Sequence, residues 1–357
     1  MKICFFADSG SIHTIRWCNY FKSLGHDVHL ISLGSALMEG IKVYPLAVEG
    51  INDSGGNWRI LFKYRQVKKL LKEIKPDIFH ALYATSYGIT GALCSFHPYV
   101  ITALGTDILL SPKQSVIYRI LLKYAFKRTD KITVVAEHMR SAAIELGAKP
   151  ENVLAIPMGV DKTIFNSANR VLSDEKFEVV STRNFEPIYN IPHLLKSVKL
   201  ALAEIPNIHV NLLGAGSLKD ELIQMSKDLG IDDHVTFVGK MPQPEMAKIL
   251  STSHVFVSLS SSDGNNISLN EGMACGTFNI ASDIPANRQW IEDNKNGFLV
   301  PVNDVDLLAK KLVESRDRFD ELTKQAAPIN EQLLERNGIW QNNMKRVEEL
   351  YDQLVKR

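Results

Sequence analysis

The sequence has few cysteines and no long apolar run, and both absences narrow the class of protein. Its four cysteines, Cys4, Cys18, Cys94 and Cys275, show neither paired nor metal-ligand spacing. This pattern indicates free thiols in a reducing compartment. The longest apolar stretches, such as 255–259, are strand-sized, whereas a membrane-spanning helix needs about 20 apolar residues. The short apolar run near the N-terminus does not resemble an export signal. We therefore expect a cytoplasmic protein.

The chain as a whole has no large excess of either charge, since its formal net charge is +1. The net charges of its two halves, however, differ in sign. Residues 1–170 hold 21 Lys and Arg against 13 Asp and Glu, a net of +8, and the remainder holds 20 against 27, a net of −7. Much of the positive charge lies in two helical patterns at 58–75 and 115–128. Such faces are usually solvated helix surfaces. The alternative is contact with an anionic partner, and we consider the inner face of a membrane or a lipid-phosphate substrate rather than nucleic acid.

At 357 residues the chain is long for one hydrophobic core, which favours two domains. Short apolar runs alternate with helical periodicity, the pattern of βαβ units around parallel sheets. Predicted strands of the first half are 2–7, 27–33, 78–82, 100–103, 131–135 and 153–156. Those of the second half are 177–181, 207–213, 235–238, 255–258 and 278–281. The polar stretch 161–175 reads as a linker, and 338–357 as a helical tail.

The stretch 260–276 carries the clearest chemical pattern. A small, polar loop follows an apolar strand and leads into a helix that Gly276 ends. Loop amides at a helix N-terminus form an anion site suited to a diphosphate. The predicted contacts in this loop and at the helix start are Gly264, Asn265, Asn266, Ile267 and Ser268. Asp263 and Glu271 could line the same pocket and accept hydrogen bonds from sugar or ribose hydroxyls. The alternative is a solvated loop in which Glu271 only complements the helix charge.

The same stretch, extended through Ile284 and followed by 286–301, resembles the signature of family 4 glycosyltransferases, which have the GT-B fold. That signature has two acidic residues separated by seven, a small-residue helix, and Cys-Gly-Thr before a strand. The resemblance implies that Glu271 binds the donor ribose and that Asp263, where the family usually has Glu, lies near the donor sugar. It also implies that Arg183 binds the diphosphate, because Arg183 follows the strand that opens the second domain. The Lys that the family usually has about six residues later is replaced by Tyr189-Asn190.

Further segments agree with the resemblance, and each has a structural alternative. Gly214 and Gly216 stand where the family has a donor-side Gly-x-Gly, although a tight turn needs the same residues. Gly239 and Lys240 match the segment near the nucleotide base. In the first half, Gly10 matches a phosphate-facing loop, and His13 is an acceptor-side candidate or a packing residue at the helix start. Asp107 is a second acceptor-side candidate, and Leu104 replaces the family's His nearby.

Taken together, the resemblance implies two Rossmann-like, doubly wound α/β domains facing a cleft. Residues 1–168 would bind the acceptor, 169–335 the nucleotide-sugar donor, and the helix at 336–357 would return to the first domain. The implied reaction is a retaining transfer from a UDP- or GDP-sugar to a glycan, a lipid-linked acceptor or a polysaccharide precursor. Neither a metal ion nor a cofactor is implied, with Arg183, Asp263 and Glu271 as the catalytic set. A nucleotide-sugar epimerase of the same fold and a non-catalytic nucleotide-sugar-binding homologue are the alternatives.

Overall fold

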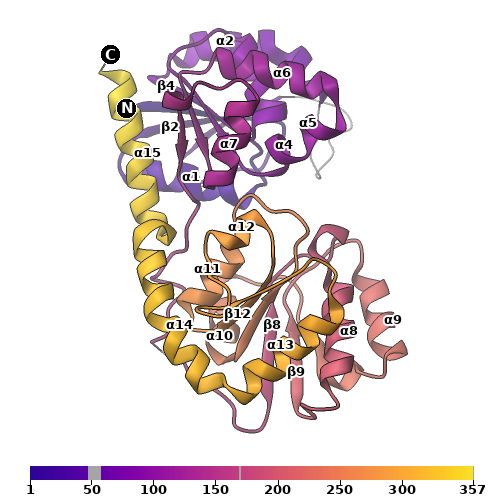
Figure 1. Cartoon of the computed structure of the whole chain (residues 1–357). Coiled ribbons are helices and arrows are strands. Elements are labelled where there is room, and N and C mark those ends of the chain that lie inside the picture. The colour runs from indigo at the N-terminus through magenta and orange to yellow at the C-terminus, as the bar shows by residue number, and fades with distance from the viewer. Residues whose placement is uncertain (47–57, 169, 357) are drawn as a thin grey trace. The chain divides into compact units, whose positions relative to one another are not determined.

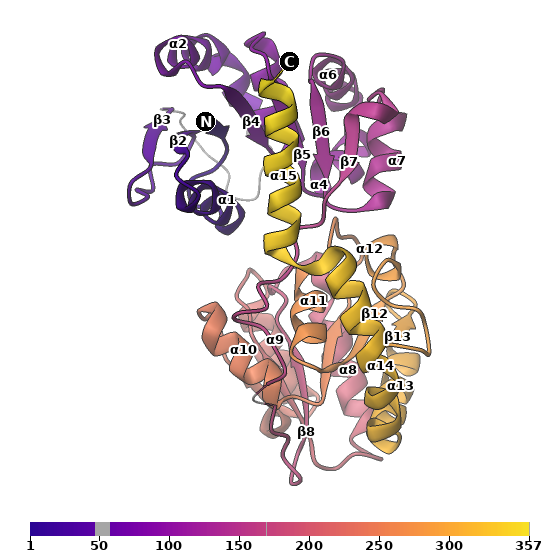
Figure 2. The same cartoon turned by 90° about the vertical axis from the view of Figure 1, so that its left-hand side faces the viewer.

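The computed structural model describes residues 1–46, 58–168 and 170–356, which form two compact units. The first unit comprises residues 1–157 and 344–357, and the second comprises residues 158–343. Each unit is built on a parallel sheet, and the two sheets are labelled in Figures 1 and 2. The predicted pair of Rossmann-like α/β domains is confirmed.

The described part of the first unit contains a seven-stranded parallel sheet. Its strands in spatial order are β3 (Lys42–Pro45), β2 (Asp27–Ser32), β1 (Lys2–Phe6), β4 (Ile78–Leu82), β5 (Tyr99–Ala103), β6 (Lys131–Val134) and β7 (Val153–Ala155). The helical segments are α1 (Ile12–Ser23), η1 (Trp58–Lys63), α2 (Tyr64–Ile74), η2 (Ala84–Gly88), α3 (Ile89–Leu93), α4 (Thr106–Leu109), α5 (Ser111–Gln114), α6 (Val116–Lys127), α7 (Glu137–Glu145), η3 (Pro150–Asn152) and most of α15 (Trp340–Val355). The continuous helix predicted at 58–75 is instead a 3₁₀ segment, η1, followed by α2.

Aromatic side chains fill both faces of this first sheet. Phe5 of β1 contacts Phe21 of α1, and Tyr351 of α15 stacks on Phe21 with ring centroids 5.0 Å apart. The neighbouring Phe6 points to the other face, because successive strand residues alternate, and there it contacts Tyr87 of η2. In Figure 2, α15 runs across the strands of this sheet. The C-terminal helix therefore completes the face that α1 begins.

His80 of β4 lies on the same face and holds α15 to the sheet. Its Nδ1 is hydrogen-bonded to the Tyr351 hydroxyl, and its Nε2 lies 2.7 Å from Thr102 Oγ1. The side chain is fully buried. Burial lowers the pKa of His80 to about 3, so the imidazole is neutral at physiological pH. This is the environment of a packed core histidine.

The described part of the second unit contains a six-stranded parallel sheet. Its strands in spatial order are β10 (Val235–Phe237), β9 (Ile208–Leu212), β8 (Phe177–Ser181), β11 (Val255–Ser258), β12 (Phe278–Ser282) and β13 (Phe298–Val300). The helical segments are η4 (Pro187–Tyr189), α8 (Ile191–Ala201), α9 (Lys219–Asp228), η5 (Asp232–His234), α10 (Gln243–Thr252), α11 (Ile267–Ala274), α12 (Pro285–Arg288), α13 (Val305–Asp317), α14 (Phe319–Leu333) and η6 (Leu334–Gly338). Alternate strand residues feed two buried clusters, with Val179 in one and Val180 in the other. Helices therefore cover both faces of the sheet, as in a doubly wound fold.

The units divide at different residues from those predicted. The sequence places the boundary after residue 168 and reads 161–175 as a linker, but the structure divides the chain after Pro157. The Val160 N–H donates to Gly338 O at 2.7 Å, and the Trp340 N–H donates to Val160 O at 3.0 Å. Phe165 is buried in the core of the second unit. The polar composition of 161–175 predicts a linker, but the burial of Phe165 is enough to pack this segment against the second unit.

Candidate functional site

The strand order of the second unit reverses direction between β8 and β11. From β8 the chain continues to β9 and β10 on one side, whereas β11, β12 and β13 lie on the other. Ligands of open α/β sheets bind at the carboxyl ends of the strands at such a switch point. Arg183 follows β8, and Asp263 and Asn266 follow β11. The topology therefore brings together residues that are some 80 positions apart in the chain.

Arg183 is the centre of the contacts at this point. Its Nη2 donates a hydrogen bond to Asp263 Oδ2 at 2.7 Å, and its Nη1 donates to Asn266 Oδ1 at 3.1 Å. The Arg183 and Asp263 side chains are only 11% and 15% exposed. The guanidinium carbon also lies 4.3 Å from the centroid of the Tyr189 ring. The guanidinium is thus held through both of its Nη atoms and, on one face, by the Tyr189 ring, and its Nε has no hydrogen-bond partner among the described residues.

Asn266 binds the loop together and has little hydrogen-bonding capacity left for a ligand. Its Nδ2 donates to Ser258 Oγ at 3.0 Å and to Asn287 Oδ1 at 2.9 Å. Its Oδ1 also accepts from the Leu269 N–H, so Asn266 is the N-cap of α11. The side chain is fully buried. The structure therefore favours a positioning role for Asn266, which holds the loop in place and accepts a hydrogen bond from Arg183.

The other residues predicted around α11 are placed by the same helix. Glu271 lies within α11 and is buried. Asn265 Oδ1 accepts hydrogen bonds from Trp290 Nε1 at 2.9 Å and from Gln289 Nε2 at 3.1 Å. Gly264 is buried in the loop, and Ile267 and Ser268 form the half-buried first turn of α11. The Ile267 N–H is already bonded to Asn265 O, so part of the expected amide cradle is used within the loop.

Several buried polar atoms beside Arg183 have no hydrogen-bond partner among the described residues. They are Ser181 Oγ at the end of β8, Thr182 Oγ1, Arg183 Nε and Ser260 Oγ just beyond β11. Buried polar groups are normally paired, and an exception needs an explanation. Their place at the carboxyl ends of the two switch-point strands is suited to a polar ligand with many oxygen atoms. Sequence patterns singled out only Arg183 of these four.

Gly214 and Gly216 support the loop that carries Arg183. A Cβ on Gly214 would lie 2.3 Å from Arg183 O, and a Cβ on Gly216 would lie 2.4 Å from Phe185 O. The Phe185 N–H donates to Ala215 O at 3.0 Å. These glycines are needed for close backbone approach, and they position the arginine rather than merely turning the chain.

Gly239 and Lys240 lie farther along the same sheet edge. They follow β10, an edge strand that is separated from β8 by β9. Gly239 has a positive φ of 88°, which explains the glycine without any ligand. Lys240 is exposed. Their predicted contact with the nucleotide base stays a prediction.

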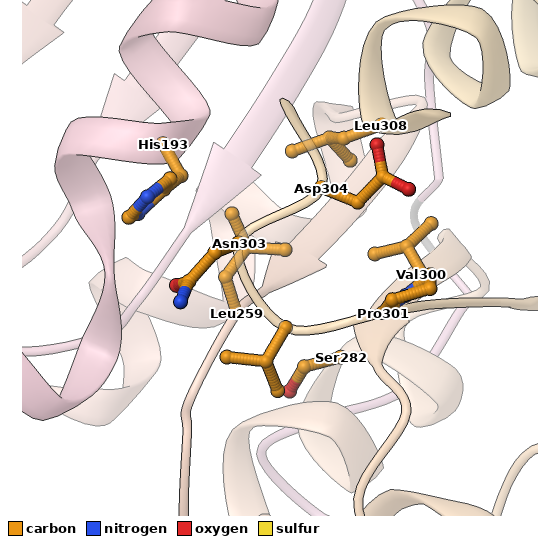
Figure 3. A pocket seen from close by; sticks show the side chains of 9 residues that line it. His193, Leu259, Ser282, Val300, Pro301, Asn303, Asp304 and Leu308 are labelled. Carbon is orange, nitrogen blue, oxygen red and sulfur yellow. The ribbon is translucent and has the colours of Figure 1, made fainter. Parts of the chain in front are cut away.

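A small cavity lies near the same edge of the sheet (Figure 3). It has a volume of about 10 Å³, room for roughly one water molecule. Leu259 and Asn303 line it from the loops after β11 and β13, Ser282 lines it from the end of β12, and His193 of α8 faces it. Burial, and to a lesser degree Lys196, lowers the pKa of His193. The cavity is too small for a nucleotide, so it is not itself the predicted donor pocket.

The predicted residues of the first unit also lie near a switch point, between β1 and β4. The Gly10 N–H donates to Asp8 Oδ1 at 3.2 Å in an exposed loop after β1, and His13 is half-buried in the first turn of α1. Tyr83, directly after β4, has a positive φ of 87°, which is strained for a non-glycine residue. No local sequence pattern singled out Tyr83, because the strain arises from the surrounding fold.

Asp107 turns its carboxylate into the protein. It accepts backbone N–H groups of Ala84 at 2.7 Å, Gly105 at 2.9 Å, Ile108 at 3.1 Å and Leu104 at 3.2 Å, and it is fully buried. Burial raises the pKa of Asp107, and the four backbone hydrogen bonds oppose that shift. This geometry favours shaping of the 104–108 turn over direct contact with an acceptor.

In residues 1–46, 58–168 and 170–356 there is no group of three or more His, Cys, Asp or Glu side chains arranged to hold a metal ion. Within those same ranges, no helix is long and apolar enough to cross a membrane.

Comparison with known proteins gives the family. Residues 2–136 match the family model described as "Glycosyl transferase 4-like", and residues 163–324 match "Glycosyl transferases group 1". The chain therefore belongs to the family 4 glycosyltransferases of the GT-B fold. It is 26% identical over 316 residues to phosphatidyl-myo-inositol mannosyltransferase of Mycolicibacterium smegmatis, covering 84% of this chain and 79% of that relative. It is 22% identical over 317 residues to N-acetyl-alpha-D-glucosaminyl L-malate synthase of Bacillus anthracis, covering 81% and 80%.

Solved structures agree on the fold. Sucrose-phosphate synthase from Thermosynechococcus elongatus superimposes with a TM-score of 0.84 at 17% identity, covering 100% of both chains. HepE of Anabaena in complex with UDP superimposes with a TM-score of 0.82 at 17% identity, covering 99% of this chain and 100% of that one. At this identity the likeness shows the GT-B fold alone.

Proposed function

We propose that this glycosyltransferase moves a hexosyl or N-acetylhexosaminyl group from a UDP- or GDP-sugar, with retention of configuration. The acceptor is a glycan, a lipid-linked acceptor or a polysaccharide precursor. One observation carries the proposal. Arg183 stands at the β8–β11 switch point with its fork fixed by Asp263 and Asn266, amid buried polar atoms that lack protein partners. An arginine and partnerless polar atoms at the carboxyl ends of the strands suit the oxygen atoms of a diphosphate.

Arg183 acts on the leaving group. Negative charge accumulates on the nucleoside diphosphate as the bond to the sugar breaks, and a fixed guanidinium stabilises that charge electrostatically. Asp263 lies near the donor sugar, and Glu271 accepts hydrogen bonds from ribose hydroxyls. The donor phosphate assists deprotonation of the acceptor on the same face, so no protein nucleophile is needed. We propose that no metal ion or cofactor takes part. Reaction at the inner face of the membrane agrees with the predicted cytoplasmic location.

Named relatives support the choice of substrates. The two relatives at 26% and 22% identity are named for mannosyl transfer and for N-acetylglucosaminyl-malate synthesis. HepE has been crystallised with UDP, with UDP and glucose, and with UDP-glucose. These names favour a sugar nucleotide as donor and leave both UDP and GDP open.

A thermal-shift screen with UDP-, GDP-, ADP- and TDP-sugars tests the donor site. A ligand that binds only the folded state raises the melting temperature by mass action. We expect stabilisation by a UDP- or GDP-sugar that is lost in Arg183→Ala and in Glu271→Ala. Arg316→Ala is the matched control, because Arg316 pairs with the adjacent Asp317 on α13 of the same unit. No shift with any nucleotide at millimolar concentration would remove the donor site from consideration.

Acceptor dependence separates transfer from the alternatives. An epimerase converts its nucleotide sugar when no acceptor is present, and a non-catalytic homologue binds the donor without turnover. We expect donor consumption only when an acceptor extract is added. NMR of the product then shows whether the anomeric configuration is retained.

A further inference from the structure

One cavity of the second unit has no part in the proposed reaction. It has a volume of about 450 Å³ and lies between residues 288–292, which continue from α12, and residues 329–336 of α14 and η6. Pockets for small organic ligands commonly have volumes of about 300 to 1,000 Å³. Four side chains of the two segments form its apolar lining, namely Trp290, Ile291, Ile329 and Leu333. The cavity therefore has the size and the apolar surface that a small organic molecule needs.

Each of the two segments also contributes an arginine to the lining. Arg288 donates from Nε and Nη2 to the carboxylate of Asp283, and among the described residues its Nη1 makes no hydrogen bond. Arg336 is exposed, and in the described part of the chain it has no ion-pair partner. The planar N–H edges of two guanidinium groups suit the oxygen atoms of a phosphate.

The carboxylates around the cavity do not compete for Arg336, because lysines already hold them. Glu292, which lines the cavity, pairs with Lys295. Glu331 and Glu335 both pair with Lys162. The charge of Arg336 is therefore available to a ligand.

The two walls of the cavity are fixed to each other. Asn296 is fully buried, and its Nδ2 donates to Trp290 O and to Asn330 Oδ1, both at 2.8 Å. Its Oδ1 accepts from the Glu292 N–H at 2.7 Å. Arg336 lies on η6, which is a single π-helical turn, and such turns occur frequently at functional sites. The cavity is thus a preformed feature of the unit.

The lining of the cavity is bonded directly to the loop at the candidate donor site. Gln289 and Trp290 both donate to Asn265 Oδ1. Asn265 precedes Asn266, the residue that caps α11 and accepts from Arg183. Both α14 and η6 also pack against α11, and α14 lies beside α11 in Figures 1 and 2. A ligand in the cavity would therefore contact the residues that hold this loop.

We propose that the cavity is an effector site for a small organic phosphate, a phosphate monoester with an apolar body, and that its occupancy raises the affinity for the donor. The phosphate bonds to Arg336 and to Nη1 of Arg288, and a phosphate monoester carries up to two negative charges for these two cations. The apolar body covers Trp290 and Leu333. A ligand that holds Gln289 and Trp290 orders Asn265 in advance, so donor binding loses less conformational entropy. The effect on the donor rests on the proposed function, whereas binding in the cavity does not.

Isothermal titration calorimetry with phenyl phosphate tests binding to the full chain. We expect saturable binding with a dissociation constant on the order of a millimolar or lower. Inorganic phosphate, which lacks the apolar body, and phenol, which lacks the anion, should each bind at least about tenfold more weakly. Arg336→Ala should weaken binding of phenyl phosphate about tenfold. Arg316→Ala, which changes an arginine of α13 that pairs with Asp317, should leave it unchanged.

Arg183 offers phenyl phosphate a second place to bind, so Arg183→Ala distinguishes the two sites. Binding that is kept in Arg183→Ala and weakened in Arg336→Ala supports the cavity. Binding that is kept in Arg336→Ala and lost in Arg183→Ala would place the ligand at the donor site. That result, or the absence of saturable binding, would overturn the proposal.

Hydrogen-exchange mass spectrometry measures the effect on the loop without any nucleotide. We expect saturating phenyl phosphate to slow exchange of the backbone amides in 264–271 at least about threefold in wild type, and not in Arg336→Ala. Exchange in α9 of the same unit should not change. Unaltered exchange in 264–271 while the cavity is occupied would show that the site does not act on the loop, and the proposal would be wrong.

Calorimetry with UDP and GDP measures the consequence for the donor. The nucleotide that binds should bind at least about threefold more tightly when phenyl phosphate is present, and this ratio should fall to one in Arg336→Ala. An unchanged ratio in wild type would overturn the effector role. If neither nucleotide binds, the proposed function fails, and the titrations with phenyl phosphate and the hydrogen exchange still decide whether the cavity binds a phosphate and acts on the loop.

Discussion

The guanidinium of Arg183 donates to the carboxylate of Asp263 at 2.7 Å, so two residues predicted to act on the donor are bonded to each other. Both side chains are largely shielded from water, so removing either partner leaves the other charge poorly solvated and unpaired. A diphosphate that binds Arg183 must compete with this carboxylate. Asp263 therefore sets how much of the arginine's charge is available to a ligand.

Replacing Asp263 by Asn should tighten the binding of free UDP or GDP while lowering turnover. Loss of the competing charge favours the phosphate, and a charge-assisted hydrogen bond of about 1.5 to 2 kcal/mol corresponds to roughly tenfold or more in affinity. Isothermal titration calorimetry with the nucleoside diphosphate measures the first effect, and steady-state kinetics with the nucleotide sugar measures the second. Weaker binding of the diphosphate by Asp263→Asn would show that the pair supports the site and does not compete with it.

Tyr189 should matter through its ring and not through its hydroxyl. The ring lies under the Arg183 guanidinium, and a shielded cation–π contact of about 1 to 2 kcal/mol corresponds to roughly five- to thirtyfold. We expect Tyr189→Leu to lower kcat/KM by about tenfold and Tyr189→Phe to stay within about twofold of wild type. Equal losses in the two variants would instead point to a hydrogen bond from the hydroxyl.

Gly214→Ala should displace the arginine without touching it. The added Cβ would meet Arg183 O at 2.3 Å, so the loop must move, and we expect donor affinity to fall at least tenfold. Overpacking of this kind costs about 1 to 3 kcal/mol of stability. Gly230→Ala is the matched control, because Gly230 has a positive φ of 61° but an open environment. It should lose about 1 kcal/mol of stability and keep its donor affinity, as measured by urea unfolding and calorimetry.

His80 should make stability fall as the solution becomes acidic. Its folded pKa of about 3 lies below the ordinary value of 6.5, so its contribution is complete above about pH 6.5 and is lost as the pH falls toward 3. The loss amounts to about 1.4 kcal/mol per pH unit in this window. Urea unfolding between about pH 7 and pH 5 should show a steeper decline for wild type than for His80→Gln. Parallel declines would assign the pH dependence to other groups.

The strands were the most predictable part of the fold. β4, β8 and β11 match their predicted bounds, because each is rich in apolar residues and is wholly or almost wholly buried. β3 and β13 were not predicted. β3 (Lys42–Pro45) is an edge strand with a partly exposed, polar sequence, and β13 (Phe298–Val300) has only three residues. Both are held by pairing with a neighbouring strand, which local composition does not encode.

The candidate site was predictable as a set of residues but not as a set of contacts. The loop-to-helix pattern and the family resemblance single out Arg183, Asp263 and Asn266 without any geometry. That Asp263 pairs with Arg183 depends on β8 lying beside β11, a register between distant segments. The stacking of Tyr189 on Arg183 also depends on the fold. From the sequence alone, Tyr189-Asn190 indicates only that the lysine usual in the family is missing. Asp107 is the opposite case. The sequence predicts an acceptor-side residue there, but in the structure its carboxylate accepts hydrogen bonds from four backbone N–H groups and holds the surrounding turn.

The placement of Tyr351 reverses the usual order of folding on the ribosome. Residues 158–343, the whole second unit, are synthesised before residues 344–357, which belong to the first unit. Domains commonly fold in the order in which they emerge, starting from the N-terminus. Here Phe21 and His80 remain uncovered until Tyr351 arrives. The first unit therefore cannot complete this face of its sheet until the residues of the second unit and Tyr351 have been synthesised.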